Sequence, residues 1–539
     1  MKKLVSVFLT LALILSLSAV AFAAEGDTNL TITNSDGRTY NGYKLLNLTV
    51  SLKSEENHPD GCNGNHTDDC YNYAYTVNGK YRTILQQNVY ANAATTFWGA
   101  AGKPSDYTKV TDEQILTYLS SLTSDNGDVY GTLRGVADRL YAAIREADIE
   151  PDATEIHDTA SIDQGYWMFA DVTNLDGKYD ANSLVMVDTK GESDITVNPK
   201  VAIPTVEKKV KDIEDSKDDS ITDNPWHDSA DHDIGDSVPF KLTATLPSNV
   251  QYYQSYTMIF HDTLSAGLTL KPDTVKVLMY ETKQEADADT ELNKGVDVTA
   301  DFTKNTDSCT DGCTFEVGCK NVFAISGIKY TSVFVVYYEA TLNENAVIGA
   351  AGNPNEVYLE FSNNPYEGGT GKTEEDKVIV FTYKLVVNKT DSHDNPLKGA
   401  GFTLSKKNLD GTYTVIGEEL KGEDMTTFTW AGLDDGDYKL EETTVPEGYN
   451  KMADIVFSIS ATHDETSDDP KLTSLDGGLM GTGDVSTGTI TKAIVNNTGT
   501  VLPETGAEGT FLLISASTMF VMVAVVFMVT RKKMSIYED

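Results

Sequence analysis

Basic residues are scarce in this chain of 539 residues. Lysine and arginine together number 42, against 82 aspartates and glutamates, which gives a formal net charge of −40. A strongly acidic protein is repelled by the phosphates of nucleic acids and by anionic membrane surfaces. Neither is therefore expected as a partner, and the charge suits a soluble surface outside the cell.

Motifs of conventional enzymes are also missing. The chain has no Gly-rich phosphate loop, Walker motif or dinucleotide fingerprint. His261 stands beside Asp262, but no serine or cysteine nucleophile motif accompanies the pair. The segment HDSADHD (227–233) contains metal-binding residue types, and we interpret it as an exposed acidic loop. We therefore expect no conventional enzyme, no cofactor and no metal site.

The chain has only five cysteines, in two groups: Cys62 and Cys70, then Cys309, Cys313 and Cys319. Outside the cell, local disulfides are the expected state, and we predict a Cys62–Cys70 bridge. Because the number is odd, one member of the second group would stay free, be poorly ordered or pair elsewhere. A zinc site built from the first pair with His58 and His66 is less favoured, since the spacing fits no regular ligand pattern.

Both ends of the chain carry targeting patterns. Residues 1–24 have two lysines, an apolar stretch and a small-x-small site, as in a secretory signal cut after Ala23 or Ala24. Residues 509–530 are uncharged and mostly apolar, long enough to cross a hydrocarbon core of about 30 Å. The basic residues 531–533 that follow favour the cytoplasmic side. The protein is thus predicted to be exported and held at its C-terminus.

The region between these ends predicts a mainly β protein. Residues 25–200 mix strand patterns with helices: Thr111 and Gln114 have the spacing of a capping box. Leu133, Val136, Ala137, Leu140 and Ile144 share one helical face. Residues 201–383 and 384–500 are almost entirely alternating strand patterns with turn signals, typical of Ig-like β-sandwiches. We expect an α+β first domain followed by two β-sandwich domains.

The two β-sandwich segments share a layout. Each has a lysine in its first strand, an acidic residue midway and an asparagine in its last strand. In the third domain these are Lys389, either Glu441 or Glu442, and either Asn496 or Asn497.

The chain resembles the sortase-assembled backbone pilins of Gram-positive bacteria over essentially its whole length. LPETG (502–506), the apolar span and the basic tail are similar to the family's cell-wall sorting signal (residues 501–539). KLEETTVPEGYN (439–450) resembles the E-box of a collagen-binding-protein B-type domain, and HDTLSAGLTL (261–270) resembles the second, CnaA-like domain. TVNPK (196–200) occupies the place of the pilin motif, with Asn198 where a tyrosine is common.

The resemblance implies an intramolecular isopeptide bond in the third domain. A buried lysine tends to lose its charge, and a neutral amine is a nucleophile. A buried glutamate tends to keep its proton and can polarise an amide. Lys389 would attack the Asn496 amide with the help of Glu442, which the E-box pattern selects over Glu441.

The second domain repeats this chemistry with an aspartate. Lys208 is the expected amine, with Lys209 on the other strand face, and Asp262 is the expected carboxyl. Asn363 is the expected amide, and Asn364 is its alternative. In the first domain Lys44 is only a weak candidate, and no triad is identified.

The resemblance also implies how the protein is used. A class C pilus sortase would recognise Leu502, Pro503, Glu504, Thr505 and Gly506, cut after Thr505 and pass its carbonyl to Lys200 of another copy. A housekeeping sortase would join the last subunit to peptidoglycan, giving a cell-wall-anchored extracellular pilus with accessory pilins as further partners. The alternative function is a non-polymerising, wall-anchored adhesin or minor pilin that binds a host ligand.

Overall fold

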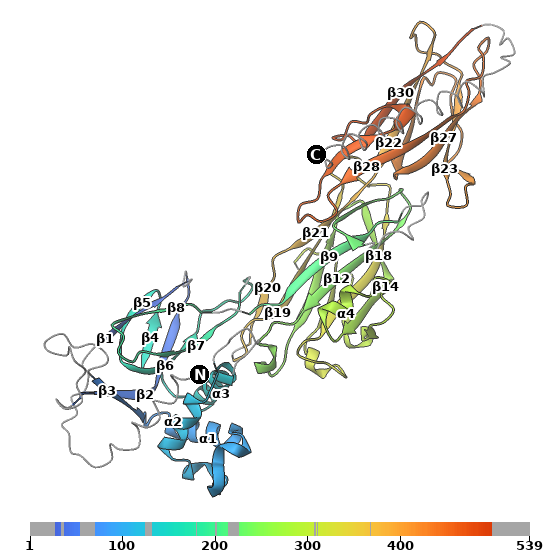
Figure 1. Ribbon diagram of the computed structural model, residues 1–539. Helices are drawn as coiled ribbons and strands as arrows, with labels where there is room; N and C mark the ends of the chain where they lie inside the picture. Colours follow the sequence, from blue (N-terminus) through green and yellow to red (C-terminus); the bar gives the residue numbers. More distant parts are fainter. Residues whose placement is uncertain are drawn as a thin grey trace, which may run out of the picture.

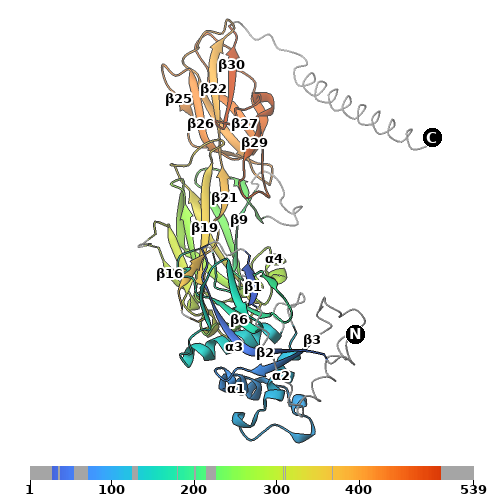
Figure 2. The same cartoon turned by 90° about the vertical axis from the view of Figure 1, so that its left-hand side faces the viewer.

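Three β-rich units follow one another along an elongated molecule (Figures 1 and 2). The computed structural model describes residues 27–33, 37–53, 71–123, 132–178, 180–199, 202–213, 226–306, 309, 311–366 and 368–498. Strands dominate, and α-helices gather in the first unit (Figure 1). The predicted fold class, mainly β with an α+β first unit, is confirmed.

The first unit, in blue to teal in Figure 1, combines two sheets with a group of helices. One sheet has the order β5-β1-β8, and the other has the order β3-β2-β6-β7 with β4 paired to β2. The strands are β1 (Asp27–Ile32), β2 (Tyr40–Leu52), β3 (Tyr71–Val77), β4 (Ala153–Ile156), β5 (Thr159–Asp163), β6 (Gly165–Asp171), β7 (Leu184–Asp188) and β8 (Asp194–Val197). The helices are α1 (Arg82–Asn92), η3 (Thr95–Ala101), η4 (Tyr107–Lys109), α2 (Asp112–Ser120) and α3 (Thr132–Glu146).

Local sequence signals explain these helices. The Thr111 hydroxyl accepts from the Gln114 backbone, and the Gln114 side chain accepts from the Thr111 backbone, so the predicted capping box starts α2. Along α3 the residues Val136, Leu140 and Ile144 are buried, as their spacing predicts. The helices thereby cover the core between them and the sheet that contains β2.

The second unit is a sandwich of two sheets. One sheet has the order β10-β9-β12-β18-β14-β15, and the other has the order β11-β21-β19-β13-β17-β16 with β20 paired to β19. The strands are β9 (Thr205–Lys211), β10 (Trp226–His227), β11 (Ser229–Asp231), β12 (Ser237–Thr245), β13 (Met258–Leu264), β14 (Leu268–Tyr280), β15 (Val296–Asp297), β16 (Thr303–Asn305), β17 (Phe315–Cys319), β18 (Val333–Leu342), β19 (Asn353–Ser362), β20 (Thr370–Lys372) and β21 (Asp376–Phe381). The helices are η6 (Val250–Tyr252), α4 (Lys283–Asp287), η7 (Thr299–Asp301) and η8 (Val322–Ala324).

The third unit, in orange to red in Figure 1, is also built from two sheets. One sheet has the order β26-β22-β30, and the other has the order β24-β23-β27-β28-β29 with β25 paired to β23. The strands are β22 (Tyr383–Asp391), β23 (Gly401–Lys407), β24 (Tyr413–Val415), β25 (Leu420–Lys421), β26 (Thr427–Leu433), β27 (Gly436–Thr444), β28 (Ile455–His463), β29 (Leu472–Asp476) and β30 (Thr489–Asn496). A short 3₁₀ helix, η9 (Gly478–Met480), follows β29.

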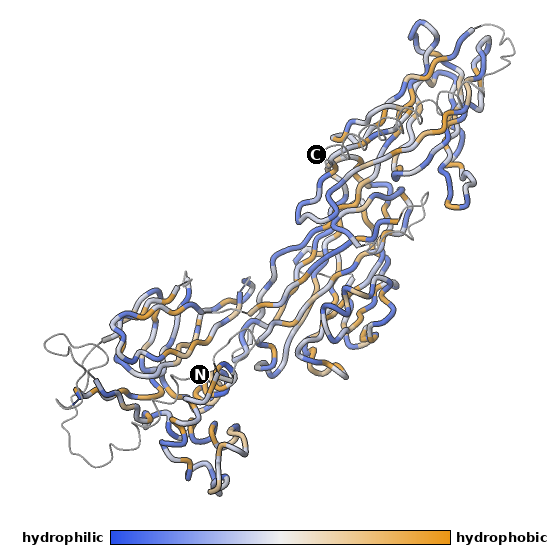
Figure 3. Tube along the Cα trace, viewed as in Figure 1, coloured by the Kyte–Doolittle hydropathy of each residue, from blue (hydrophilic) through white to orange (hydrophobic). Residues whose placement is uncertain are grey.

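Alternation along the strands sets both sandwich cores. In β19 every second side chain from Asn353 to Phe361 is buried, and the intervening ones are partly exposed. In β27 the same alternation buries Tyr438, Leu440 and Glu442. Hydrophobic and hydrophilic residues accordingly alternate along much of the trace in Figure 3. A polar residue on the inward parity of a strand is therefore forced into the core.

The segment 227–233, interpreted above as an exposed acidic loop, is instead buried, and that interpretation was wrong. Ser229 and Asp231 belong to β11, which pairs in parallel with β21, and they are 0% and 3% exposed. The Ser229 hydroxyl donates to the backbone oxygen of Asp464 and lies 2.7 Å from Nδ1 of His463, both in the third unit. The acidic residues thus form part of the contact between the second and third units, which sequence patterns along one chain segment cannot reveal.

No helix within the described residues is long and apolar enough to cross a membrane. The predicted signal at residues 1–24 and the predicted span at residues 509–530 lie outside the described residues.

Candidate functional site

Three polar side chains lie together in the interior of the third unit. Lys389 on β22, Glu442 on β27 and Asn496 on β30 are 1%, 0% and 1% exposed. Nδ2 of Asn496 donates to Oε1 of Glu442 at 2.7 Å, and the backbone N–H of Met452 donates to Oε2 at 2.9 Å. The Lys389 amine donates to the backbone oxygen of Ile494 at 3.1 Å. The structure therefore brings together all three residues predicted from the sequence.

Strand register explains this meeting. β22 and β30 are parallel neighbours in which Lys389 lies opposite Ile494 and Asp391 lies opposite Asn496. Asn496 is thus the diagonal neighbour of Lys389 on the same face, a position whose Cα atom is about 7–8 Å away. Glu442 reaches the pair from β27 in the facing sheet.

The surroundings shift the Lys389 amine toward its neutral form. Burial lowers the pKa of Lys389 to about 8, and the nearby Glu442 and Asp391 carboxylates only partly oppose this. The amide oxygen Oδ1 of Asn496 is buried and accepts no hydrogen bond from any described residue. The cluster thus holds a nucleophile with a lowered pKa beside an amide whose oxygen lacks a donor.

The structure also separates the alternatives that the sequence left open here. Glu441 faces outward and pairs with Lys451, whose amine lies 3.0 Å from it. Asn497 is exposed, and its backbone oxygen accepts from Asn450. Glu442 and Asn496 are the members of each pair that point into the core.

A second buried cluster lies between the two sheets of the second unit. Nζ of Lys208 on β9 lies 2.5 Å from Oδ2 of Asp262 on β13, and both residues are 0% exposed. The Tyr338 hydroxyl on β18 donates to the Asp262 carboxyl at 3.0 Å, and Asn355 on β19 donates through Nδ2 to the Tyr338 oxygen at 2.7 Å. Oδ1 of Asn355 is buried and has no hydrogen-bond partner in the described part of the chain.

Burial pushes both partners of the Lys208–Asp262 pair toward their neutral forms. It lowers the pKa of Lys208, and the attraction of Asp262 offsets this only in part. It raises the pKa of Asp262 against the same attraction. Both shifts move the pair toward a neutral amine and a protonated carboxyl, the two forms that attack on an amide requires.

Asn363, the amide expected from the sequence, does not lie at this cluster. Asp262 is opposite Val357 in the β13–β19 register, so Asn355 is its diagonal neighbour. Asn363 lies six residues beyond Val357, about 20 Å at the rise of a strand. Its Nδ2 donates to the backbone oxygen of Leu175 at 2.8 Å, where the first and second units meet.

Asn355 and Tyr338 were therefore missed by sequence reasoning. Asn353, Asn355 and Asn363 share the inward parity of β19 and its extension, so alternation allows each of them. Only the register of β19 against β13 selects Asn355. Lys209, the alternative to Lys208, faces the other side of β9 and pairs with Asp228.

The first unit offers a different environment for Lys44. Its amine lies 3.3 Å from the exposed Asp163 carboxylate and 5.9 Å from the ring centroid of Trp167. Lys44 therefore makes a surface ion pair.

Several predicted site residues lie outside the described residues. These are the acceptor Lys200, the sortase motif Leu502, Pro503, Glu504, Thr505 and Gly506, and the cysteines Cys62 and Cys70.

The second cysteine group does not contain the expected pair plus one free thiol. Cys309, Cys313 and Cys319 are all free of disulfides. Cys319 ends β17 with its side chain buried in the core, whereas Cys313 precedes this strand beside His261. The strand from Phe315 to Cys319, about 13 Å long, lies between Cys313 and Cys319 and keeps the two sulfur atoms too far apart for a bond.

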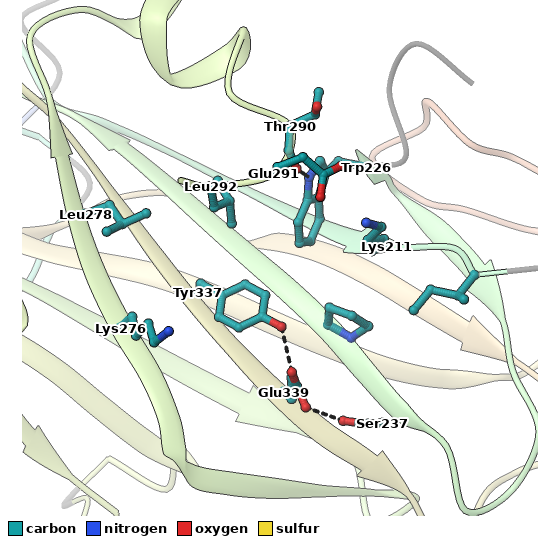
Figure 4. A pocket seen from close by; sticks show the side chains of 12 residues that line it. Lys211, Trp226, Ser237, Lys276, Leu278, Thr290, Glu291, Leu292, Tyr337 and Glu339 are labelled. Atoms are coloured by element: carbon teal, nitrogen blue, oxygen red, sulfur yellow. Dashed lines mark hydrogen bonds between the residues drawn. The ribbon is translucent and has the colours of Figure 1, made fainter. Parts of the chain in front are cut away.

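A surface pocket lies over the outer face of the sheet that contains β12, β18 and β14 (Figure 4). The Tyr337 hydroxyl donates to Glu339, which also accepts from Ser237, as the dashed lines in Figure 4 show. The Trp226 indole closes the pocket at one side and donates to the backbone oxygen of Thr290 at 2.9 Å. The polar groups of Tyr337, Glu339, Ser237 and Trp226 are thus engaged in hydrogen bonds within the protein.

Three family models match the chain in succession. Residues 234–365 match the Gram-positive pilin backbone subunit 2, Cna-B-like domain, residues 383–471 match the SpaA prealbumin-like fold domain, and residues 494–535 match the LPXTG cell wall anchor motif. The model that matches residues 234–365 is described as Cna-B-like, whereas a CnaA-like domain was predicted for this part of the chain.

Relatives of known identity are also pilins or surface proteins. The trypsin-resistant surface T6 protein of Streptococcus pyogenes is 28% identical over 271 residues, which is 47% of this chain and 44% of that protein. The matched region thus spans less than half the length of this relative. Among solved structures, the T6 backbone pilin of S. pyogenes is 17% identical with a TM-score of 0.45, covering 90% of this chain and 100% of that one. The major pilin SpaD of Corynebacterium diphtheriae is 16% identical with a TM-score of 0.40 at the same coverages.

In chain order, the three models are those of a pilin backbone domain, a prealbumin-like domain and a cell wall anchor motif. Residues 234–365 are thus similar to a domain of Gram-positive backbone pilins, and the curated relative shares 28% identity over 271 residues. The family resemblance inferred from the sequence is thus confirmed, as is the location at the cell wall, outside the cell.

Proposed function

We propose that this protein is the structural subunit of a covalent pilus and that its second and third units are each closed by a Lys–Asn isopeptide bond. One observation carries the proposal: two successive β-sandwiches each enclose a lysine, a carboxyl and an asparagine that are at most 1% exposed. Burying such groups is costly unless they react or pair, and their repetition in two units indicates a shared chemistry.

In the third unit, the neutral amine of Lys389 attacks Cγ of Asn496. The Glu442 carboxyl polarises the amide carbonyl, whose oxygen faces it after a half-turn of the amide group. The carboxyl then carries a proton from the amine to the leaving nitrogen, so that one N–C bond forms, one C–N bond breaks and ammonia leaves. Folding supplies the proximity, and oriented intramolecular groups reach effective molarities of about 10⁵–10⁸ M.

In the second unit, Lys208 attacks Asn355 with Asp262 as the proton carrier. The Tyr338 hydroxyl forms hydrogen bonds with both Asp262 and Asn355, so it holds the carboxyl and the amide close to each other. The product would join β9 in one sheet to β19 in the other. We therefore replace Asn363 by Asn355 as the amide of this unit.

Between subunits, a pilus sortase would cut after Thr505 of LPETG and transfer its carbonyl to the amine of Lys200 on another copy. A housekeeping sortase would attach the last subunit to peptidoglycan. In this role the protein is a building block and not an enzyme acting on other molecules.

Denaturing electrophoresis of cell-wall extracts tests the polymer. Wild-type protein should give a ladder of high-mass species, and Lys200→Ala should give monomer alone. Lys190→Ala, a change at an exposed lysine ten residues earlier, is the matched control and should keep the ladder. A ladder that persists in Lys200→Ala would contradict the assignment of Lys200, and a wild type without any ladder would favour a single wall-anchored adhesin.

A further inference from the structure

Four metal-ligating side chains meet on the outer face of the second unit. They are His261 on β13, Asp311 and Cys313 in the turn before β17, and Glu316 on β17. One donor atom from each lies within 4.8 Å of all the others. His261 points away from the core, on the face opposite to that of its neighbour Asp262, and the proposed isopeptide chemistry does not use it.

The four donor atoms lie close enough together to be compared with a tetrahedral cage. Nδ1 of His261 lies 2.9 Å from Oδ2 of Asp311 and 3.6 Å from Oε1 of Glu316. Sγ of Cys313 lies 4.0 Å from this Nδ1 and 4.0 Å from the same Oε1. Zinc bonds of about 2.0–2.3 Å in a tetrahedron place ligand atoms roughly 3.3–3.7 Å apart. These four distances differ from that range by about 0.4 Å or less, so small side-chain movements would bring these pairs into coordination.

The backbone holds these residues in place. His261 lies directly opposite Glu316 in the antiparallel β13–β17 pair, so their side chains share one face. The turn is anchored by the Thr314 N–H, which donates to the backbone oxygen of Asp262 at 2.7 Å, and by the Cys313 N–H, which donates to Asp311 at 3.1 Å. The site is thus assembled by sheet register and one short turn.

A second layer of contacts orients the histidine. Nε2 of His261 is buried and faces Oε2 of Glu360 at 3.4 Å, while Nδ1 faces the other three donors. The Tyr358 ring stacks on the imidazole with centroids 4.5 Å apart, and its hydroxyl donates to Asp311. A ligating histidine whose other nitrogen faces a carboxylate is the usual outer arrangement of a metal site.

The charges also favour a cation. Three carboxylates, from Asp311, Glu316 and Glu360, surround one imidazole. Even a protonated histidine leaves an excess of negative charge at a site where His261 is only 6% exposed. The carboxylates are only partly covered, but like charges this close together repel one another, and a bound cation would relieve that repulsion.

We propose that His261, Asp311, Cys313 and Glu316 bind one Zn²⁺ ion. A set of one nitrogen, one sulfur and two oxygen donors suits zinc, whereas calcium and magnesium prefer oxygen alone. The Cys313 thiol loses its proton to solvent as the Zn–S bond forms. Four protein ligands leave no open position, so the ion is structural. It fastens the turn before β17 to the back of β13, the strand that carries Asp262.

The test is metal binding by the purified mature protein, kept reduced and refilled with zinc alone. Elemental analysis should give one zinc per chain, and replacement by Co²⁺ should give a thiolate-to-cobalt charge-transfer band. Cys313→Ser and His261→Ala should each weaken zinc binding at least about 100-fold and remove or shift that band. Cys309→Ser and Cys319→Ser are matched controls and should keep the zinc. Far-ultraviolet circular dichroism checks that each variant is folded.

Three results would overturn the proposal. The first is a folded wild type that takes up no zinc. The second is zinc that stays bound in Cys313→Ser but is lost when Cys62 and Cys70 are changed, since the ion would then sit in another part of the chain. The third is a Cys309–Cys313 disulfide in protein isolated from cells without reductant, because a disulfide removes the Cys313 ligand.

Discussion

The bond proposed for the third unit can be tested through its effect on stability. Lys389→Met removes the nucleophile but keeps an unbranched apolar side chain in the core position. In the wild type, the bond between Lys389 and Asn496 closes a loop that contains residues 390–495. In the unfolded chain this loop restricts conformational freedom, as a disulfide would.

The magnitude follows from the loop length. Closing a loop of about 100 residues is worth roughly 4.7 kcal/mol in the chain-entropy description. A change of 1 kcal/mol shifts the melting temperature by about 4 °C for a unit of this size. Lys389→Met should therefore melt roughly 20 °C below the wild type in the transition that belongs to the third unit.

Intact mass tests whether the Lys389–Asn496 bond forms, and differential scanning calorimetry tests how much it raises the melting temperature. The wild type should be lighter than its amino-acid sequence requires by about 17 Da, one ammonia, for each bond, and Lys389→Met should lose one such deficit. Lys384→Met, on the same strand but facing outward, is the matched control and should change neither quantity. A wild type at full mass would refute the bond. A variant without the bond that melts within a few degrees of the wild type would refute the loop-closure argument.

Two further predictions concern the second unit and its contact with the third. Asn355→Ala should abolish the second mass deficit of about 17 Da, because Asn355 supplies the amide, whereas Asn363→Ala should retain it; the reverse result would restore Asn363 as the amide. At the contact between the units, burial lowers the pKa of His463 but Asp231 more than offsets this, so the pKa is raised above its ordinary 6.5. A raised histidine pKa contributes stability that is full below pH 6.5 and is lost as the pH rises through the folded-state value. The melting temperature of the wild type should therefore fall more steeply than that of His463→Gln between about pH 6 and 9, and parallel curves would contradict this role. Asp434, whose raised pKa acts in the same direction, is present in both proteins.

The chain passes almost without interruption from the second unit into the third. β21 ends at Phe381 and β22 begins at Tyr383, so a single buried residue, Thr382, separates the last strand of one sandwich from the first strand of the next. Ile379 and Phe381 pack into the core of the third unit. Tension that enters at β22 would cross from Lys389 to Asn496 through the proposed bond, and residues 390–495 would stay outside the path of the load.

The resemblance to backbone pilins identified much of the chemistry from the sequence, and the alternation along the strands agrees with it. Lys389, Glu442 and Asn496 each stand on the inward parity of a strand rich in apolar neighbours, so their burial follows from the chain alone. The same holds for Lys208 and Asp262. The mainly β fold and the helix start at Thr111 likewise depend on local patterns, which is why they were predicted correctly.

Long-range register and contacts between units decided the rest. Parity allows Asn355 and Asn363 equally, and they are distinguished only by the pairing of β19 with β13, a contact between residues nearly one hundred positions apart. The acidic segment 227–233 looks solvated in the sequence, but β11 docks against β21 and His463 and becomes buried. His261, Asp311 and Glu316 come from two strands and a turn whose meeting depends on the same sheet. Local propensity acts over a few residues, whereas the free energy that selects a register comes from the whole packed core.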